Sequence, residues 1–173
     1  MCVDYRALND CTTDVSWPIP NIEPIRRIGS LKPKIFGIMD LTQGYHQAPL
    51  SNTTKAYKAF ITFSGVYEFT RLPLGPKRAS SYFQEIMATV VLVGLIYMIC
   101  KVYIDDCSVF GDTNIEFVSR LRLVFERFRK NSLCLKANKC YFDFKKFEFV
   151  GKVLSEEGLK ISHPKIQSRA GPT

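Results

Sequence analysis

The chain has few of the residues that mark common metal-binding or secreted proteins. Its 173 residues include two histidines and six cysteines, and the cysteines stand at positions 2, 11, 100, 107, 134 and 140 without any CxxC pair. This spacing does not fit a zinc finger and offers no disulfide framework. We therefore expect reduced, mostly packed thiols and an intracellular protein.

Long hydrophobic runs and a targeting segment are also missing from the chain. The most apolar run, residues 86–100, is shorter than the roughly 20 residues that a membrane-spanning helix needs. Asp4 and Arg6 interrupt any apolar region near the first residue, so no secretory signal is recognised there. We expect residues 86–100 to be buried core, with insertion into a membrane interface as the minor alternative, and we expect no membrane partner.

Apolar and basic residues are spread along the whole length of the chain. Hydrophobic residues make up 46%, enough for the core of one domain-sized unit, and the formal net charge is +8 with a pI near 9.2. A basic surface of this kind is suited to phosphate-bearing partners. Charge alone does not distinguish such a protein from a generic basic one.

Two adjacent acids stand out in the middle of residues 101–111. Val102, Ile104 and Val109 favour strands, whereas Asp105 and Asp106 are typical of turns, so the segment is predicted to be a hairpin with two carboxylates at its tip. A lone pair of acids between strands is more often a turn that faces water.

A third acid makes a functional interpretation stronger. Asp40 ends another strand-like run, residues 35–40, and two strand ends can meet in space. Carboxylate oxygens are the ligands that Mg²⁺ prefers, and two such ions stabilise the attacking and leaving oxygens of a phosphoryl displacement. The acids therefore indicate two-metal nucleotidyl transfer, with a Mg²⁺-dependent phosphatase or nuclease as an alternative.

The segment Tyr103-Ile-Asp-Asp106 resembles the signature tetrad of reverse transcriptases, and the surrounding chain resembles those of gypsy-like LTR retrotransposons. Further matching segments occur in that family's order at about its spacing: residues 2–9, 39–47, 72–75, 83–84, 139–140 and 149–151. The resemblance covers nearly the whole chain and implies an RNA-directed DNA polymerase fragment of a Pol polyprotein, in a cytoplasmic particle or the nucleus.

The resemblance also implies a role for particular residues. The polymerase would extend a primer 3′-hydroxyl with dNTPs on an RNA or DNA template, using two Mg²⁺ ions, with Mn²⁺ as an alternative. The implied catalytic residues are Asp40, Asp105 and Asp106, joined by Leu41 as metal ligands. The implied nucleotide-binding residues are Tyr45, Leu74, Gly75, Tyr103 and Ile104, with Tyr45 excluding the 2′-hydroxyl. The implied template and primer contacts are Asp4, Arg6, Val150 and Gly151.

The expected fold is α+β: a polymerase palm, with an antiparallel sheet and helices packed on one face, plus partial fingers. Thumb and RNase H are expected in the remainder of the Pol polyprotein. The expected parts are 1–35, partial fingers and connector; 36–50, palm with the first acid strand; 51–75, fingers hairpin; 76–160, palm with the acid hairpin and primer grip; and 161–173, a tail.

The expected elements follow from periodicity and turn residues. Strands are expected at residues 2–6, 58–63, 66–71, 133–135, 140–144 and 147–154, with Ser64-Gly65 as the turn of the fingers hairpin. Helices are expected at residues 21–28, after Asp40, at 78–93 with Phe83, Ile86, Met87 and Val90 as its apolar stripe, and from Thr113 or Asn114 to Lys130.

One loop departs from the family pattern, which is close to L-P-F-G-L-x-N-A-P. This chain has residues 72–80 as Leu-Pro-Leu-Gly-Pro-Lys-Arg-Ala-Ser, so Pro76 restricts the backbone and Arg78 replaces a small polar residue. Lys77 or Arg78 could instead contact phosphate. The alternative to an active polymerase is a catalytically silent remnant or a nucleic-acid-binding module.

Overall fold

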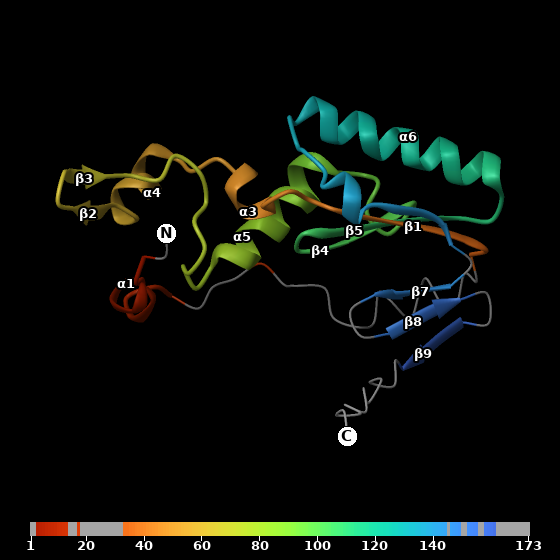
Figure 1. Ribbon diagram of the computed structural model, residues 1–173, viewed down its shortest axis with the longest axis horizontal. Coiled ribbons are helices and arrows are strands. Elements are labelled where there is room, and N and C mark those ends of the chain that lie inside the picture. The colour runs from red at the N-terminus through yellow and green to blue at the C-terminus, as the bar shows by residue number, and fades with distance from the viewer. Residues whose placement is uncertain are drawn as a thin grey trace, which may run out of the picture.

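The computed structural model describes residues 3–13, 17, 33–144, 146–149, 152–155 and 158–161, the last three ranges at the level of the backbone. The chain is a mixed α+β protein with antiparallel sheets (Figure 1). Val150, Gly151 and the helix expected at 21–28 lie outside the described residues, as do the connector after Trp17 and nearly all of the expected tail.

A four-stranded antiparallel sheet organises the structure, with strand order β4-β5-β1-β6. Its strands are β1 (Ile35–Asp40), β4 (Cys100–Tyr103), β5 (Asp106–Gly111) and β6 (Tyr141–Phe144). The β4–β5 hairpin is the one predicted from its acids, and β1 pairs with β5 along its whole length. The pairing places the ends of β1 and of the hairpin side by side.

Helices cover one face of this sheet and form the core with it (Figure 1). They are α5 (Ala79–Ile86), continued by the π-helix η1 (Met87–Val91), and α6 (Asn114–Lys130). Phe83 and Met87 pack with Phe117 and Val124 of α6 against the sheet residues Val102, Cys107 and Met39. The antiparallel palm-like arrangement therefore has its helices on the face opposite Lys101 and Ser108, which alternate with the core positions.

The predicted apolar stripe of the helix at 78–93 is wrong at its last residue, Val90, because a π-turn follows α5. Leu92 N–H donates to Met87 O, the i→i+5 bond of a π-turn. This turn moves the buried face from Val90, which is 55% exposed, to Val91, which is 2% exposed. A π-turn has no simple signature in residue periodicity.

Helix α6 begins and ends where its sequence predicts. The hydroxyl of the N-cap residue Thr113 accepts from Glu116 N–H, and the Glu116 carboxylate accepts from the N–H of Asp112, just before the cap. Arg120 does not lie on the solvated face of α6. It pairs with Glu116 at 2.6 Å and donates to Phe110 O at 2.8 Å, so it holds α6 against β5.

The half of the chain before α5 is less regular than predicted. The short helices are α1 (Arg6–Asp10), α3 (Gly44–Gln47) and α4 (Asn52–Tyr57), and the strands are β2 (Phe60–Thr62) and β3 (Gly65–Tyr67). The strand expected at 2–6 is wrong for the described residues, because the chain turns into α1 at Arg6. Helix α4 was not predicted, although Ser51 caps it through Thr54 N–H.

The β2–β3 hairpin is shorter than expected, and its turn residues are Phe63 and Ser64, since Thr62 pairs with Gly65. It extends from the end of the molecule remote from the main sheet (Figure 1). Ile61 and Val66 face each other across it and are 81% and 69% exposed. Phe63 at the turn is fully exposed.

The last described segment contains three short antiparallel strands after the 3₁₀ helix η2 (Ala137–Lys139). They are β7 (Lys146–Phe149), β8 (Lys152–Ser155) and β9 (Gly158–Ile161). The strand predicted at 133–135 is reduced to one bridge between Leu135 and Leu41. No helix among the described residues is long and apolar enough to cross a membrane.

The five cysteines that the structure describes are free thiols. Cys100 in β4 and Cys107 in β5 are buried strand residues of the acid hairpin, as expected for packed thiols. Cys11 and Cys134 are exposed, so the expectation of mostly packed thiols is wrong for these two.

Candidate active site

The register of two strands brings the predicted acids together. Asp40, the last residue of β1, is the direct cross-strand partner of Asp106, the first residue of β5. Cα atoms of such antiparallel partners are about 4.5–5.5 Å apart. Asp105 precedes Asp106 in the turn, and its carbonyl accepts from Leu41 N–H at 3.2 Å. All three acids therefore lie at one corner of the sheet.

A buried amide holds the turn that carries Asp105. Ile104 has a φ of +54°, a left-handed conformation that is unfavourable for a β-branched residue. Gln84 of α5 is 2% exposed, and its Oε1 accepts from Ile104 N–H at 2.9 Å while its Nε2 donates to Val102 O at 3.3 Å. Helix α5 thus holds strand β4 and the turn residue directly before the acids.

The position of Asp105 depends on a glycine in the next element. A Cβ on Gly44 would lie 2.9 Å from Asp105 Oδ1, closer than real Cβ contacts. This oxygen is buried and has no hydrogen-bond partner among the described residues. The absence of a side chain at Gly44 therefore leaves room for the carboxylate of Asp105.

Burial and mutual repulsion make the acids reluctant to ionise. Desolvation raises the pKa of Asp105, and the neighbouring charges of Asp106 and Asp40 raise it further. Desolvation and Asp40 also raise the pKa of Asp106. The ammonium of Lys139, whose Nζ lies 3.1 Å from Asp40 Oδ2, lowers the pKa of both acids. The cluster is an anionic centre partly compensated by one lysine.

The acids do not form a complete metal cage by themselves. In the parts of the chain that the structure describes, no three His, Cys, Asp or Glu side chains are arranged to hold a metal ion. The donors fit Mg²⁺ in kind, because they are carboxylate oxygens and one of them is buried without a partner. Substrate phosphates and water commonly supply the remaining ligands of Mg²⁺.

The residues predicted to bind the nucleotide differ in how they contact the elements that carry the three acids. The ring of Tyr45 packs 5.5 Å from that of Phe83, and its hydroxyl lies 2.8 Å from the Ser80 hydroxyl. Desolvation raises the pKa of Tyr45, and the nearby Asp105 raises it further. Tyr103 is the cross-strand partner of Asp106.

The loop that departs from the family pattern is fastened to α1. Asn9 Nδ2 donates to Gly75 O at 3.0 Å, and Lys77 N–H donates to Asn9 Oδ1 at 2.6 Å. Gly75 has a φ of +110°, and a Cβ there would lie 3.0 Å from the Tyr5 ring, so glycine is required. Leu74 beside it is 58% exposed and does not join the core.

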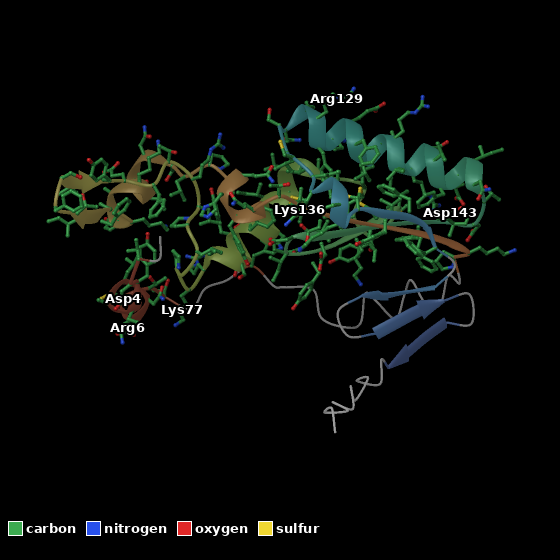
Figure 2. All side chains as sticks on the ribbon, viewed as in Figure 1. Asp4, Arg6, Lys77, Arg129, Lys136 and Asp143 are labelled. Atoms are coloured by element: carbon green, nitrogen blue, oxygen red, sulfur yellow. The ribbon has the colours of Figure 1, made fainter. Side chains whose placement is uncertain are left out.

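Asp4 and Arg6 form an ion pair with a shortest distance of 2.6 Å, and Arg6 lowers the pKa of Asp4. Both side chains are exposed. Figure 2 shows them at the start of α1, well apart from Lys136, whose N–H donates to Asp40 O. The structure therefore does not bring Asp4 and Arg6 to the acid centre.

Sequence reasoning missed four residues that shape this site: Lys139, Gln84, Gly44 and Ser80. Lys139 and Gln84 occur in the matching family segments, but the match did not indicate that Lys139 pairs with Asp40 or that Gln84 holds the acid hairpin. Gly44 lies in the matching segment 39–47 and Ser80 in the atypical loop, but neither had a predicted role, because their contacts are between elements distant in sequence.

Comparison with known proteins establishes the family. Residues 1–169 match the sequence model described as reverse transcriptase (RNA-dependent DNA polymerase). The chain therefore belongs to the reverse transcriptase family, as its motifs indicated.

The similar proteins include Pol polyproteins of Drosophila melanogaster retrotransposons. The chain is 34% identical over 167 residues to the retrovirus-related Pol polyprotein from transposon 297 and 35% identical over 169 residues to that from transposon opus. These matches cover 96% and 97% of the chain but 16% and 17% of the polyproteins. The chain thus spans about a sixth of the length of these relatives.

Solved structures agree on the fold. The foamy viral protease-reverse transcriptase in complex with RNA/DNA hybrid superposes with a TM-score of 0.72 at 22% identity, over 98% of this chain and 23% of that chain. A second structure of the foamy viral protease-reverse transcriptase, in complex with double-stranded DNA, also gives 0.72 at 22% identity, over 98% of this chain and 30% of that chain.

Proposed function

We propose that this chain is the palm and part of the fingers of an RNA-directed DNA polymerase that transfers dNTPs to a primer 3′-hydroxyl. The observation that carries the proposal is the register of β1 with β5. It pairs Asp40 with Asp106 and leaves Asp105 in the adjoining turn, within a chain of the reverse transcriptase family. Two strand ends thereby present three carboxylates at one point.

The residues that would hold two Mg²⁺ ions, or Mn²⁺, are Asp40, Asp105, Asp106 and the backbone of Leu41. The buried, unpartnered Oδ1 of Asp105 supports this assignment. When bound, such ions stabilise the attacking and leaving oxygens of phosphoryl transfer. The raised pKa values of Asp105 and Asp106 are those expected of carboxylates that await a cation.

The remaining roles concern the incoming nucleotide. Tyr45 would lie beneath the sugar and exclude a 2′-hydroxyl, and Tyr103 with Ile104 would border the same pocket. Leu74 and Gly75 would approach the nucleotide through the loop that Asn9 fastens to α1. The contact between the Tyr45 and Phe83 rings supports a fixed position for the gate.

The template and primer, RNA or DNA, would lie across the basic chain. Asp4 and Arg6, both exposed at the start of α1, would contact the template strand, and Val150 with Gly151 would hold the primer. The foamy viral relative has been solved with RNA/DNA hybrid and with double-stranded DNA, which supports such partners. The rest of a Pol polyprotein, including thumb and RNase H, would complete the enzyme.

In this proposal the palm comprises residues 36–50 and 76–160, and the fingers comprise residues 1–35 and 51–75, with a tail at 161–173. The compact packing of the sheet with α5 and α6 supports the palm assignment. The separate β2–β3 hairpin supports the fingers assignment.

A metal titration and a primer-extension assay test the proposal together. Mn²⁺ binding to the chain, followed by electron paramagnetic resonance, should weaken strongly in Asp105→Asn. Asp10→Asn, which removes an exposed carboxylate on α1, should bind like the wild type. Extension of a DNA primer on an RNA template should depend on Asp105 in the same way. Equal Mn²⁺ binding by all three proteins would reject the assigned site.

A nucleic-acid-binding module without catalysis is the second candidate. Two observations favour it: the described residues lack a complete three-ligand arrangement, and Lys139 already pairs with Asp40. This candidate predicts binding of primer–template without any incorporation of dNTPs, even when Mn²⁺ binds.

A further inference from the structure

Ser80 stands at the position where the family pattern L-P-F-G-L-x-N-A-P ends in proline. It lies in the first turn of α5 (Ala79–Ile86), where a proline is tolerated because the backbone N–H has no partner within the helix. Serine is therefore not required to start this helix. Its side chain makes a different contact, since its Oγ lies 2.8 Å from the hydroxyl of Tyr45.

Tyr45 is fixed at its backbone end by the acid turn. It follows Gly44, whose Cα packs so closely against Asp105 that a Cβ there would lie 2.9 Å from Oδ1. Gln43 before it has a φ of +47°, and α3 is a single turn. The backbone therefore positions the base of the Tyr45 side chain relative to the acids, independently of what the ring contacts.

The ring end of Tyr45 has two neighbours, both on α5. Phe83 contacts the ring at 5.5 Å between centroids with an interplanar angle of 54°. This tilted packing contact holds the ring against α5, but it is less directional than a hydrogen bond. The hydrogen bond with Ser80 is directional and therefore fixes where the hydroxyl lies.

We propose that Ser80 positions the Tyr45 ring and thereby sets how strictly this chain discriminates between deoxyribo- and ribonucleotides. The inference rests on the proposed function, in which Tyr45 is the sugar gate. Ser80 is a positioning residue and does not itself contact the nucleotide. In a chain with proline at this position the hydroxyl of Tyr45 would have no such partner.

Nucleotide binding with a double-mutant cycle tests the inference. The measured quantity is the ratio of dissociation constants for dATP and ATP, in the presence of primer–template and Mn²⁺, for wild type, Ser80→Ala, Tyr45→Phe and the double variant. One neutral hydrogen bond corresponds to a change on the order of fivefold. Each single variant should lower the preference for dATP by about that factor.

The double variant separates positioning from a structural effect. Because Ser80→Ala and Tyr45→Phe delete the same bond from its two ends, the double variant should lose no more than either single one. Additive losses, or an unchanged preference in Ser80→Ala, would overturn the inference. Ser80→Pro, which keeps the start of the helix, should behave like Ser80→Ala. Ser119→Ala, which removes a hydroxyl from α6, should match the wild type.

Failure of the proposed function gives a different result. If Tyr45→Ala leaves the dATP to ATP ratio unchanged, or the wild type binds neither nucleotide, the gate assignment falls and the role of Ser80 falls with it. If Tyr45→Ala removes the preference but Ser80→Ala retains it, only the role of Ser80 is wrong. NMR of ¹³C-labelled tyrosine, with Tyr45 assigned through Tyr45→Phe, shows independently whether Ser80→Ala alters the environment of the phenol.

Discussion

The ammonium of Lys139 lies 3.1 Å from Oδ2 of Asp40, so a side-chain cation already contacts the acid corner of the sheet. Lys139 follows α6 and stands in the 3₁₀ helix η2, whereas Asp40 ends β1. The pair joins segments 99 residues apart. Its charge acts on all three acids and not on Asp40 alone, because Lys139 also lowers the pKa of Asp105 and Asp106.

Lys139→Met should therefore raise the pKa of Asp105 and of Asp106. The physical reason is that removal of the nearby positive charge disfavours the ionised carboxylates. A pH titration of the aspartate carboxyl carbons by ¹³C NMR measures the change directly. Lys136→Met is the matched control, since its backbone contact to Asp40 O survives the substitution. Unshifted midpoints in Lys139→Met would contradict the electrostatic role of this lysine.

Asp105→Asn should stabilise the chain at neutral pH. Burial and neighbouring acids raise the pKa of Asp105 in the folded state, so its ionised form is destabilising above that pKa. Neutral asparagine removes this penalty, by on the order of 1 kcal/mol, a common gain when a functional site is neutralised. The advantage should be present at pH 7 and disappear as the pH falls below about 3.8, where the acid is protonated in both states. Urea unfolding at both pH values measures it.

Gln84→Met should loosen the acid turn. The substitution keeps the size of the side chain but leaves Ile104 N–H and Val102 O without their partner, at a cost of roughly 1–3 kcal/mol for each group. Hydrogen exchange at the Ile104 amide should accelerate together with the loss of stability. Tyr82→Phe removes another hydrogen bond of α5, to Pro49 O, and should leave the Ile104 amide protected.

Lys101→Met should also stabilise the chain. Lys101 is 1% exposed, its ammonium has no hydrogen-bond partner among the described residues, and desolvation lowers its pKa to about 8. Below pH 8 the lysine is charged in both the folded and the unfolded state, and burial of that charge costs roughly 3 kcal/mol. Methionine should recover much of this free energy.

The pH dependence of stability distinguishes this explanation from improved packing. Between pH 8 and about 10.5 the folded state has lost the proton that the unfolded state retains, so wild-type stability should rise with pH. Lys101→Met should lack this rise. An identical rise in both proteins would show that another group causes it.

Binding of the chain to duplex DNA should weaken steeply with salt. The net charge of +8 supplies a sequence-independent attraction, and each neutralised phosphate contributes roughly 0.9 to the log–log slope. If Arg6 contacts one phosphate, Arg6→Ala should lower the slope by about that amount. Arg122→Ala on the exposed face of α6 should not change it. Fluorescence anisotropy between 50 and roughly 200 mM salt is suitable for the comparison.

The elements that could be predicted are those that the chain specifies locally. The acid hairpin follows from β-branched residues on either side of Asp105 and Asp106, and α6 follows from its apolar stripe and the cap at Thr113. The meeting of Asp40 with the hairpin was also accessible, because both acids end strand-like runs. For the hairpin and α6 the information lies within a few neighbouring residues, whereas the meeting of Asp40 with the hairpin joins segments far apart in the chain.

The contacts that could not be predicted depend on tertiary packing. The π-turn after Ile86 moves the buried face of the helix, and α1 replaces a strand although residues 2–6 alternate in polarity. Ser80 and Tyr45 are 35 residues apart, and nothing in either segment indicates that their hydroxyls meet. Roles of this kind become visible only when the distances between elements are known.

The β2–β3 hairpin has a practical consequence for handling the protein. Within the described chain it forms a sheet of two strands, so both of its edges carry unpaired backbone groups. Ile61, Phe63 and Val66 expose apolar surface beside those edges. Open edges next to apolar side chains favour strand pairing between molecules. Concentrated solutions of the chain should therefore self-associate through this hairpin. Ile61→Lys should keep such solutions free of self-association for longer.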